Sequence, residues 1–143
     1  MSARVVSCGD PGYVYARPSR SPISPRSGSK RERELEHPVA ILPQEHSSFN
    51  PEKMGKATLF ESERILVGLN CFEQGQEHDL HAHAGMDKVY HVISGAGLFL
   101  LEGRELPMES GVMMVAPAGV PHGIRNTGQG RLVVLAILAP APG

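Results

Sequence analysis

The chain has 143 residues, of which 41% are hydrophobic, and this is enough for one domain with a modest core. The 14 lysine and arginine residues nearly balance the 15 aspartate and glutamate residues, so no overall basic charge attracts nucleic acid or anionic lipid. The longest apolar run, residues 132–140, is far shorter than the roughly 20 residues that a membrane helix needs. We therefore expect a single domain with neither nucleic acid nor a membrane as partner.

The N-terminal residues 1–36 are rich in serine, arginine and proline and have almost no apolar periodicity, so they cannot bury enough surface to offset the entropy of ordering. We expect a disordered tail at 1–36 and one domain at 37–143. A targeting peptide is an alternative, although no amphipathic helix pattern supports it. A mis-called start codon is another. The N-terminus also lacks the apolar core of a secretory signal.

The two cysteines, Cys8 and Cys71, are far apart and form no CxxC pair, which argues against a disulfide framework and a thiolate zinc site. A reducing, cytoplasmic location fits best. As a small thiol in an apolar stretch, Cys71 is expected in the core.

From residue 39 onward, short apolar stretches alternate with glycine, proline, asparagine and aspartate. None keeps a helical period over a dozen residues, so we predict an all-β sandwich or barrel. Glu102 and Gly103 suit a tight hairpin. Residues 133–138 are apolar throughout, which predicts burial on both faces, inside the protein or against a second subunit. The predicted stretches are 57–60, 64–72, 87–93, 96–102, 111–116, 123–126 and 131–138.

Histidines cluster in residues 78–91. His81 and His83 are two positions apart, and in a strand such side chains share a face about 7 Å apart, from which both can reach one metal ion. His122 follows the rigid PAGVP turn and opens a later stretch. His78 and His91 have the opposite strand parity, so we expect them to face away from such a site.

Glycines, prolines and histidines also recur at defined spacings. The first group is Gly75, His81, His83 and Gly95, and the second is Gly111, Pro117, Gly119, His122 and Asn126. Together they resemble the two conserved motifs of the cupin superfamily. The resemblance implies a double-stranded β-helix, a jelly-roll barrel, in which His81, His83 and His122 bind one divalent metal.

One position departs from this pattern, because Lys88 stands where the first cupin motif normally supplies a glutamate ligand. A lysine ammonium has no lone pair, and a dication about 5 Å away at an effective dielectric near 20 repels it by roughly 6 to 7 kcal/mol. Three arrangements are compatible with it: a three-histidine site, a bulge that brings in Asp87, or a weak metal site whose pocket binds an anion with the help of Lys88. Tyr90, in phase with Lys88, is expected to present its hydroxyl to a ligand.

The leading functional hypothesis is a metal-binding cupin with a three-histidine site, suited to Fe, Mn, Ni, Zn or Cu and open to a small molecule. As an enzyme it would be an oxygenase or isomerase, although no residue identifies itself as a catalytic base. The alternative is a non-catalytic module that binds or senses an anion or a sugar, with weak metal or none. A homodimer is plausible from the apolar last strand.

Overall fold

The computed structural model describes residues 39–142. It divides into two units, Met1–Leu42 and Pro43–Gly143, and of the first unit only residues 39–42 are described. The strands and the site lie in the second unit. The predicted tail at 1–36 and Cys8 fall outside the described residues, so both remain predictions.

A short 3-10 helix, η1, precedes a series of strands in the described part of the chain. Within residues 39–142 no helix is long and apolar enough to cross a membrane. The elements are η1 Pro43–His46, β1 Gly55–Glu61, β2 Leu66–Phe72, β3 Glu77–His81, β4 Asp87–Ser94, β5 Ala96–Leu101, β6 Arg104–Glu109, β7 Met113–Ala116, β8 His122–Arg125 and β9 Leu132–Ala139.

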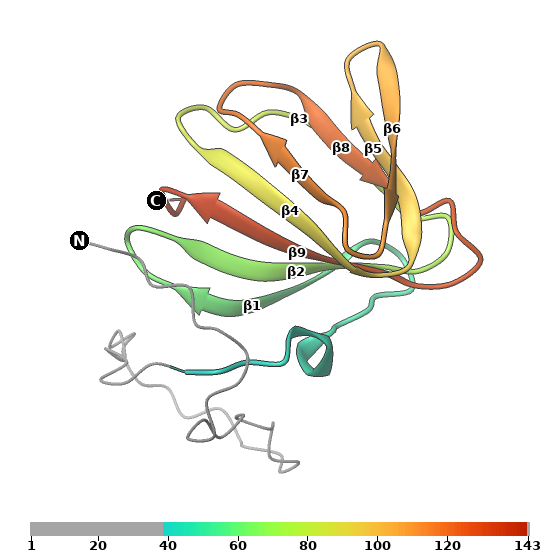
Figure 1. The fold of residues 1–143 in the computed structure, drawn as a ribbon, viewed down its shortest axis with the longest axis horizontal. Coiled ribbons are helices and arrows are strands. Elements are labelled where there is room, and N and C mark those ends of the chain that lie inside the picture. Colours follow the sequence, from blue (N-terminus) through green and yellow to red (C-terminus); the bar gives the residue numbers. More distant parts are fainter. Residues whose placement is uncertain (1–38, 143) are drawn as a thin grey trace. The chain divides into compact units, whose positions relative to one another are not determined.

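The strands form two antiparallel sheets (Figure 1). One has five strands in the order β1-β2-β9-β4-β7, and the other has four in the order β3-β8-β5-β6. Consecutive strands such as β2 and β3, or β7 and β8, therefore belong to different sheets, as they do in a jelly roll. The predicted all-β fold is confirmed.

The main core lies between the two sheets. Its buried residues are Phe72, Tyr90, Val92, Phe99, Met108, Ala116, Ile124, Leu132, Val134 and Ala136. Within β4, Tyr90 and Val92 are buried and His91 is exposed, which is the alternation expected of a strand with one buried face. This alternation places the side chains of Lys88, Tyr90 and Val92 on the inner face of the five-stranded sheet.

The strand β9 lies between β2 and β4 and is buried on both faces, as its sequence predicts. Val134 and Ala136 join the core between the sheets, whereas Val133 packs on the other face in a second cluster with Leu69 and Cys71. Because both faces of β9 are buried within the second unit, its apolar sequence does not require burial against a second subunit. Cys71 is a fully buried core residue on this outer face, with a pKa raised by burial.

Two sharp turns shape the strand connections. Leu101 pairs with Arg104, so Glu102 and Gly103 form the predicted two-residue hairpin between β5 and β6. Gly95, between β4 and β5, has φ 89° and lies so close to the carbonyl oxygen of Arg131 that a Cβ atom would overlap it. The motif position therefore needs glycine for both its backbone conformation and its packing.

Candidate metal centre

Two adjacent strands of the four-stranded sheet bring the first and last motif histidines together. His81 ends β3, His122 begins β8, and the two residues are paired in the strand register. Their ring centroids are 4.5 Å apart. The PAGVP segment ends where β8 begins, so the turn delivers His122 to the sheet as the sequence predicts.

The third histidine lies beyond the end of the strand. β3 ends at His81, so His83 belongs to the connection between β3 and β4, and the expectation that one strand carries both residues is wrong. A backbone hydrogen bond replaces strand pairing at this point: the amide of Gly119 donates to the carbonyl oxygen of His83 at 2.9 Å. The turn that precedes His122 therefore also holds His83 in place.

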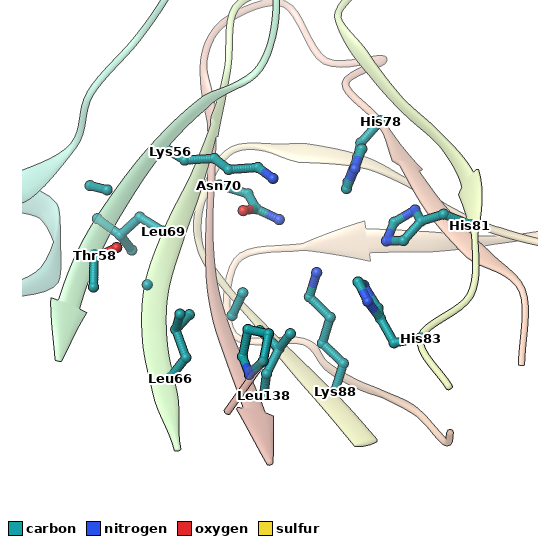
Figure 2. A pocket seen from close by; sticks show the side chains of 14 residues that line it. Lys56, Thr58, Leu66, Leu69, Asn70, His78, His81, His83, Lys88 and Leu138 are labelled. Carbon is teal, nitrogen blue, oxygen red and sulfur yellow. The ribbon is translucent and has the colours of Figure 1, made fainter. Parts of the chain in front are cut away.

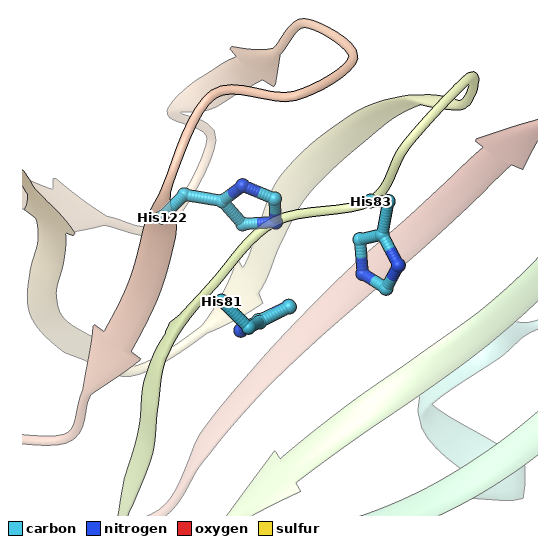
Figure 3. Close-up of side chains that lie close together, drawn as sticks. All are labelled: His81, His83 and His122. Carbon is cyan, nitrogen blue, oxygen red and sulfur yellow. The ribbon is translucent and has the colours of Figure 1, made fainter.

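The imidazoles of His81, His83 and His122 converge (Figure 3). Their potential ligand nitrogens all lie within 4.8 Å of one another. Nitrogens that bind one ion at about 2.1 Å can be at most about 4.2 Å apart, so small ring rotations are enough to close the site. The structure brings together the three histidines that the two motifs supply.

Ring hydrogen bonds define which nitrogen of His81 and of His122 is available to a metal. Nδ1 of His81 donates to the carbonyl oxygen of Asp79, and Nδ1 of His122 donates to that of Val120, both at 2.8 Å. A proton on Nδ1 leaves the lone pair on Nε2. The Nε2 atoms of all three histidines are buried and have no hydrogen-bond partner. Buried polar atoms without partners are costly, and a shared divalent ion satisfies all three, so the donor set fits a metal.

The surroundings of the site also favour neutral imidazoles. Burial lowers the pKa values of His83 and His122, and the positive charges of Lys88 and His81 lower them further. The hydrogen bond from His122 to Val120 opposes this effect only in part. A neutral imidazole is the form that binds a metal ion.

Lys88 lies on the inner face of β4 and is 6% exposed. Its Nζ is 4.8 Å from the centre of the Tyr90 ring, a cation–π distance. Burial, followed by the charge of Lys56, lowers the pKa of Lys88 to about 8. Lys88 lines the same pocket as His81 and His83, and among residues 39–142 no glutamate takes the place of the missing fourth ligand.

Asp87 does not enter the site. It is exposed, and its Oδ1 accepts a hydrogen bond from the amide of Ala118 at 2.9 Å. The pairing of β4 with β9 runs through Asp87 and Lys88 without a shift, and the pairing of β4 with β7 begins at Lys88. The bulge that would have brought this carboxylate to the metal is absent, and Asp87 instead fixes the turn before His122.

His78 faces the site, contrary to the expectation from strand parity. The register of β3 shifts by one residue between His78 and His81, which puts both side chains on one face. Their ring centroids are 4.1 Å apart. Burial, then the charge of His81, lowers the pKa of His78 to about 3, and its Nδ1 is buried without a partner.

The other two predicted positions lie as follows. Tyr90 is fully buried, with its ring 5.8 Å from that of His122, and its hydroxyl has no hydrogen-bond partner. It belongs to the core beside the site and does not line the pocket, so its contact with a ligand remains a prediction. His91 is exposed on the opposite face of β4, as predicted.

A pocket of about 270 Å³ extends from the histidines across the five-stranded sheet (Figure 2). Its polar lining includes two residues that the sequence analysis missed, Lys56 on β1 and Asn70 on β2. They are register partners on adjacent strands. Neither belongs to a motif, and only the tertiary pairing of β1 and β2 reveals that they adjoin the histidines.

The fold and these motifs agree with the family comparison. The family model described as a cupin domain matches residues 68–138, which include all three histidines. The chain belongs to the cupin superfamily.

Similar proteins differ in what their names state. The chain is 33% identical over 64 residues to an oxalate-binding protein of Thermotoga maritima, covering 45% of this chain and 53% of that one. It is 36% identical over 67 residues to an acireductone dioxygenase of Rhodopseudomonas palustris, covering 44% and 40%. The chain thus spans about half the length of the curated relatives it matches. The crystal structure of the TT1209 protein of Thermus thermophilus is 37% identical, with a TM-score of 0.66, and covers 69% of this chain and 94% of that one.

Proposed function

We propose that this protein binds one divalent transition metal through His81, His83 and His122 and presents the metal to a small molecule. The observation that carries the proposal is the set of three buried Nε2 atoms that converge and have no hydrogen-bond partner. Three protein ligands leave open coordination positions, as catalytic metal sites do. Imidazole ligands suit Fe, Mn, Ni, Zn and Cu.

The proposed ligand is an oxygen-rich molecule that can chelate the metal. The names of two relatives support this class, since one binds oxalate and the other is a dioxygenase. Lys88 would hold a negative charge on such a molecule, and the strands around the site would limit the access of water. When bound, the metal would supply a Lewis acid or, if redox-active, a centre for dioxygen chemistry.

Elemental analysis tests the metal site. Protein purified without added metal and without a histidine tag is expected to carry about one transition metal ion per chain. His83→Ala is expected to reduce this content strongly, because it removes one of three ligands. Sub-stoichiometric metal of every kind in the parent protein, even after incubation with Mn²⁺, Fe²⁺, Ni²⁺ and Zn²⁺, would refute the proposal.

The choice between an oxygenase or isomerase and a non-catalytic binding module depends on the metal. The parent chain reconstituted with Co²⁺ is expected to change its visible spectrum on addition of oxalate, because the open positions accept an oxygen chelator. A metal that is redox-active as isolated favours an oxygenase, whereas Zn²⁺ favours an isomerase or a binding module. A cytoplasmic location and a homodimer remain predictions from the sequence.

A further inference from the structure

The pocket beside the histidines has an unbalanced charge. Lys56 and Lys88 both line it, and no aspartate or glutamate of the described chain does so. Neither lysine forms a salt bridge with another residue in the range 39–142. A divalent metal at the histidines adds to this positive charge. Like charges in a partly buried space repel one another, so the pocket is built for a ligand that carries negative charge.

The two lysines of the pocket lie at two levels of the five-stranded sheet, and each level is defined by the β9 residue in the same row. Lys56 on β1 pairs with Asn70 on β2, which pairs with Val134 on β9. Lys88 on β4 pairs with Leu138, four residues further along β9. Figure 2 shows Lys56 and Asn70 at one end of the pocket, with Lys88 extending from the other end beside His83 so that its ammonium points toward them. A ligand in the pocket therefore meets Lys56 and Asn70 from one side, and Lys88 and the histidines from the other.

Asn70 supplies a donor at the first level. Its side chain is 5% exposed, and its Nδ2 is buried without a hydrogen-bond partner. Leaving such a group unpaired costs about 1 to 3 kcal/mol, and an acceptor on a ligand removes this cost. The ammonium of Lys56 adjoins it from the pocket rim (Figure 2). An amide N–H and an ammonium beside each other are suited to a carboxylate.

The middle of the pocket is small and apolar. Gly68 and Ala136 are register partners in the row between the two levels, and Leu66 and Leu138 also line the pocket. Its volume of about 270 Å³ lies just below the range of about 300–1,000 Å³ that is usual for drug-sized ligands. A short hydrocarbon chain fits this lining better than a sugar, whose hydroxyl groups would lose hydrogen bonds there.

We propose that the pocket binds a small aliphatic dicarboxylate, with one carboxylate at the metal and Lys88 and the other between Lys56 and Asn70. This inference rests on the proposed metal site and specifies its ligand class. A dianion places one negative charge beside the metal and Lys88 and a second beside Lys56 and Asn70. We expect a chain of about four to six carbons to fill the apolar middle better than oxalate, whose two carboxyl carbons are joined directly.

The test compares matched acids on protein loaded with Mn²⁺. Isothermal titration calorimetry measures succinate, glutarate and adipate against butyrate, which has the carbon count of succinate but a single carboxylate. At least one of the three diacids is expected to bind about 10-fold or more tightly than butyrate. Lys56→Met and Asn70→Leu are expected to remove most of this preference, because each weakens the binding of the diacids far more than the binding of butyrate. Lys53→Met, at an exposed lysine that does not line the pocket, is the matched control and keeps the preference.

The outcomes separate this inference from the metal site on which it rests. If the parent chain binds no metal, the proposed function fails and the inference fails with it. If the chain binds Mn²⁺ but no diacid binds more tightly than butyrate, only the inference is overturned. A diacid preference that survives both Lys56→Met and Asn70→Leu would equally overturn it, because the second carboxylate would then lie elsewhere.

Discussion

A methyl group added at Gly123 should disturb the metal site without touching any of its three ligands. Gly123 follows His122 on β8 and packs against β3. A Cβ atom there would lie 2.6 Å from the carbonyl oxygen of His78 and 3.1 Å from the backbone carbon of Asp79. Both contacts are to backbone, so no flexible side chain can move aside. Gly123→Ala must therefore displace β3 relative to β8.

The size of the effect follows from these distances. Ordinary contact begins at 3.4 Å, so the strands must separate by about 0.8 Å. Metal–ligand distances tolerate only about 0.2 Å, and His81 and His122 are on the two strands that move apart. We expect the dissociation constant for Zn²⁺ to rise about 10- to 100-fold, the range seen when groups that orient ligands are removed. The free energy of unfolding should fall by about 1 to 3 kcal/mol, as for other overpacked sites.

Competitive metal titration and urea denaturation measure the two effects. Gly130→Ala is the control, because a Cβ atom at Gly130 meets no atom within 4 Å, and both quantities should stay at the parent values. If Gly123→Ala lowers the stability but leaves the metal affinity unchanged, the distance between β3 and β8 does not determine how tightly the metal binds. No change in either quantity would show that the strand packing described for Gly123 is wrong.

Four other perturbations test separate parts of the structure. His83→Ala should lose most of the bound metal in elemental analysis, whereas His91→Ala, on the exposed face of β4, should keep it. Lys88→Glu should tighten metal binding in competitive titration at neutral pH, since it replaces a repelled cation with an oxygen ligand, and equal affinity would count against its inward position. Tyr90→Phe removes a buried hydroxyl without a partner, so the metal-free protein should gain about 1 kcal/mol against urea; a loss would mean that the hydroxyl is bound. Deletion of residues 1–36 should leave the melting temperature nearly unchanged, and a large drop would refute the predicted tail.

The motif positions are predictable from the sequence because their physical requirements are local. Gly95 needs a positive φ and has no space for a side chain, and the PAGVP turn delivers His122 to the start of β8. The backbone conformation of such turns restricts the residue type locally, although the lack of space at Gly95 also depends on Arg131. The alternating pattern of β4 and the fully apolar pattern of β9 likewise predict their one-sided and two-sided burial.

The orientation of His78 could not be predicted, because it depends on a bulge. Parity assigns side chains to faces only while a strand stays regular, and one extra residue reverses the assignment for all that follow. The shift lies between His78 and His81 and involves the pairing of β3 with β8, a strand more than forty residues further along the chain. No local signal in the EHDLH sequence indicates it.

Lys56 and Asn70 were missed for a different reason. They belong to β1 and β2, which the sequence predicts as ordinary strands. They lie near the histidines only because the five-stranded sheet packs against the four-stranded sheet. A lysine in a strand is by itself usually a solvated surface residue. Its functional meaning appears only when the same pocket is known to be lined by Lys88 and by two of the potential metal ligands, His81 and His83.

The lysine at the place of the cupin glutamate changes how metal and ligand depend on each other. A glutamate would add negative charge, which would offset part of the charge of a divalent ion before any further anion binds. With Lys88 and Lys56 in the pocket, a divalent ion meets repulsion until an anion arrives, and an anion meets a stronger positive field once the ion is bound. Each partner therefore raises the affinity for the other, and by the reciprocity of binding free energies the two factors must be equal. The proposed site would hold its metal most tightly when its anionic ligand is present, and a lysine at this position would then be compatible with metal binding.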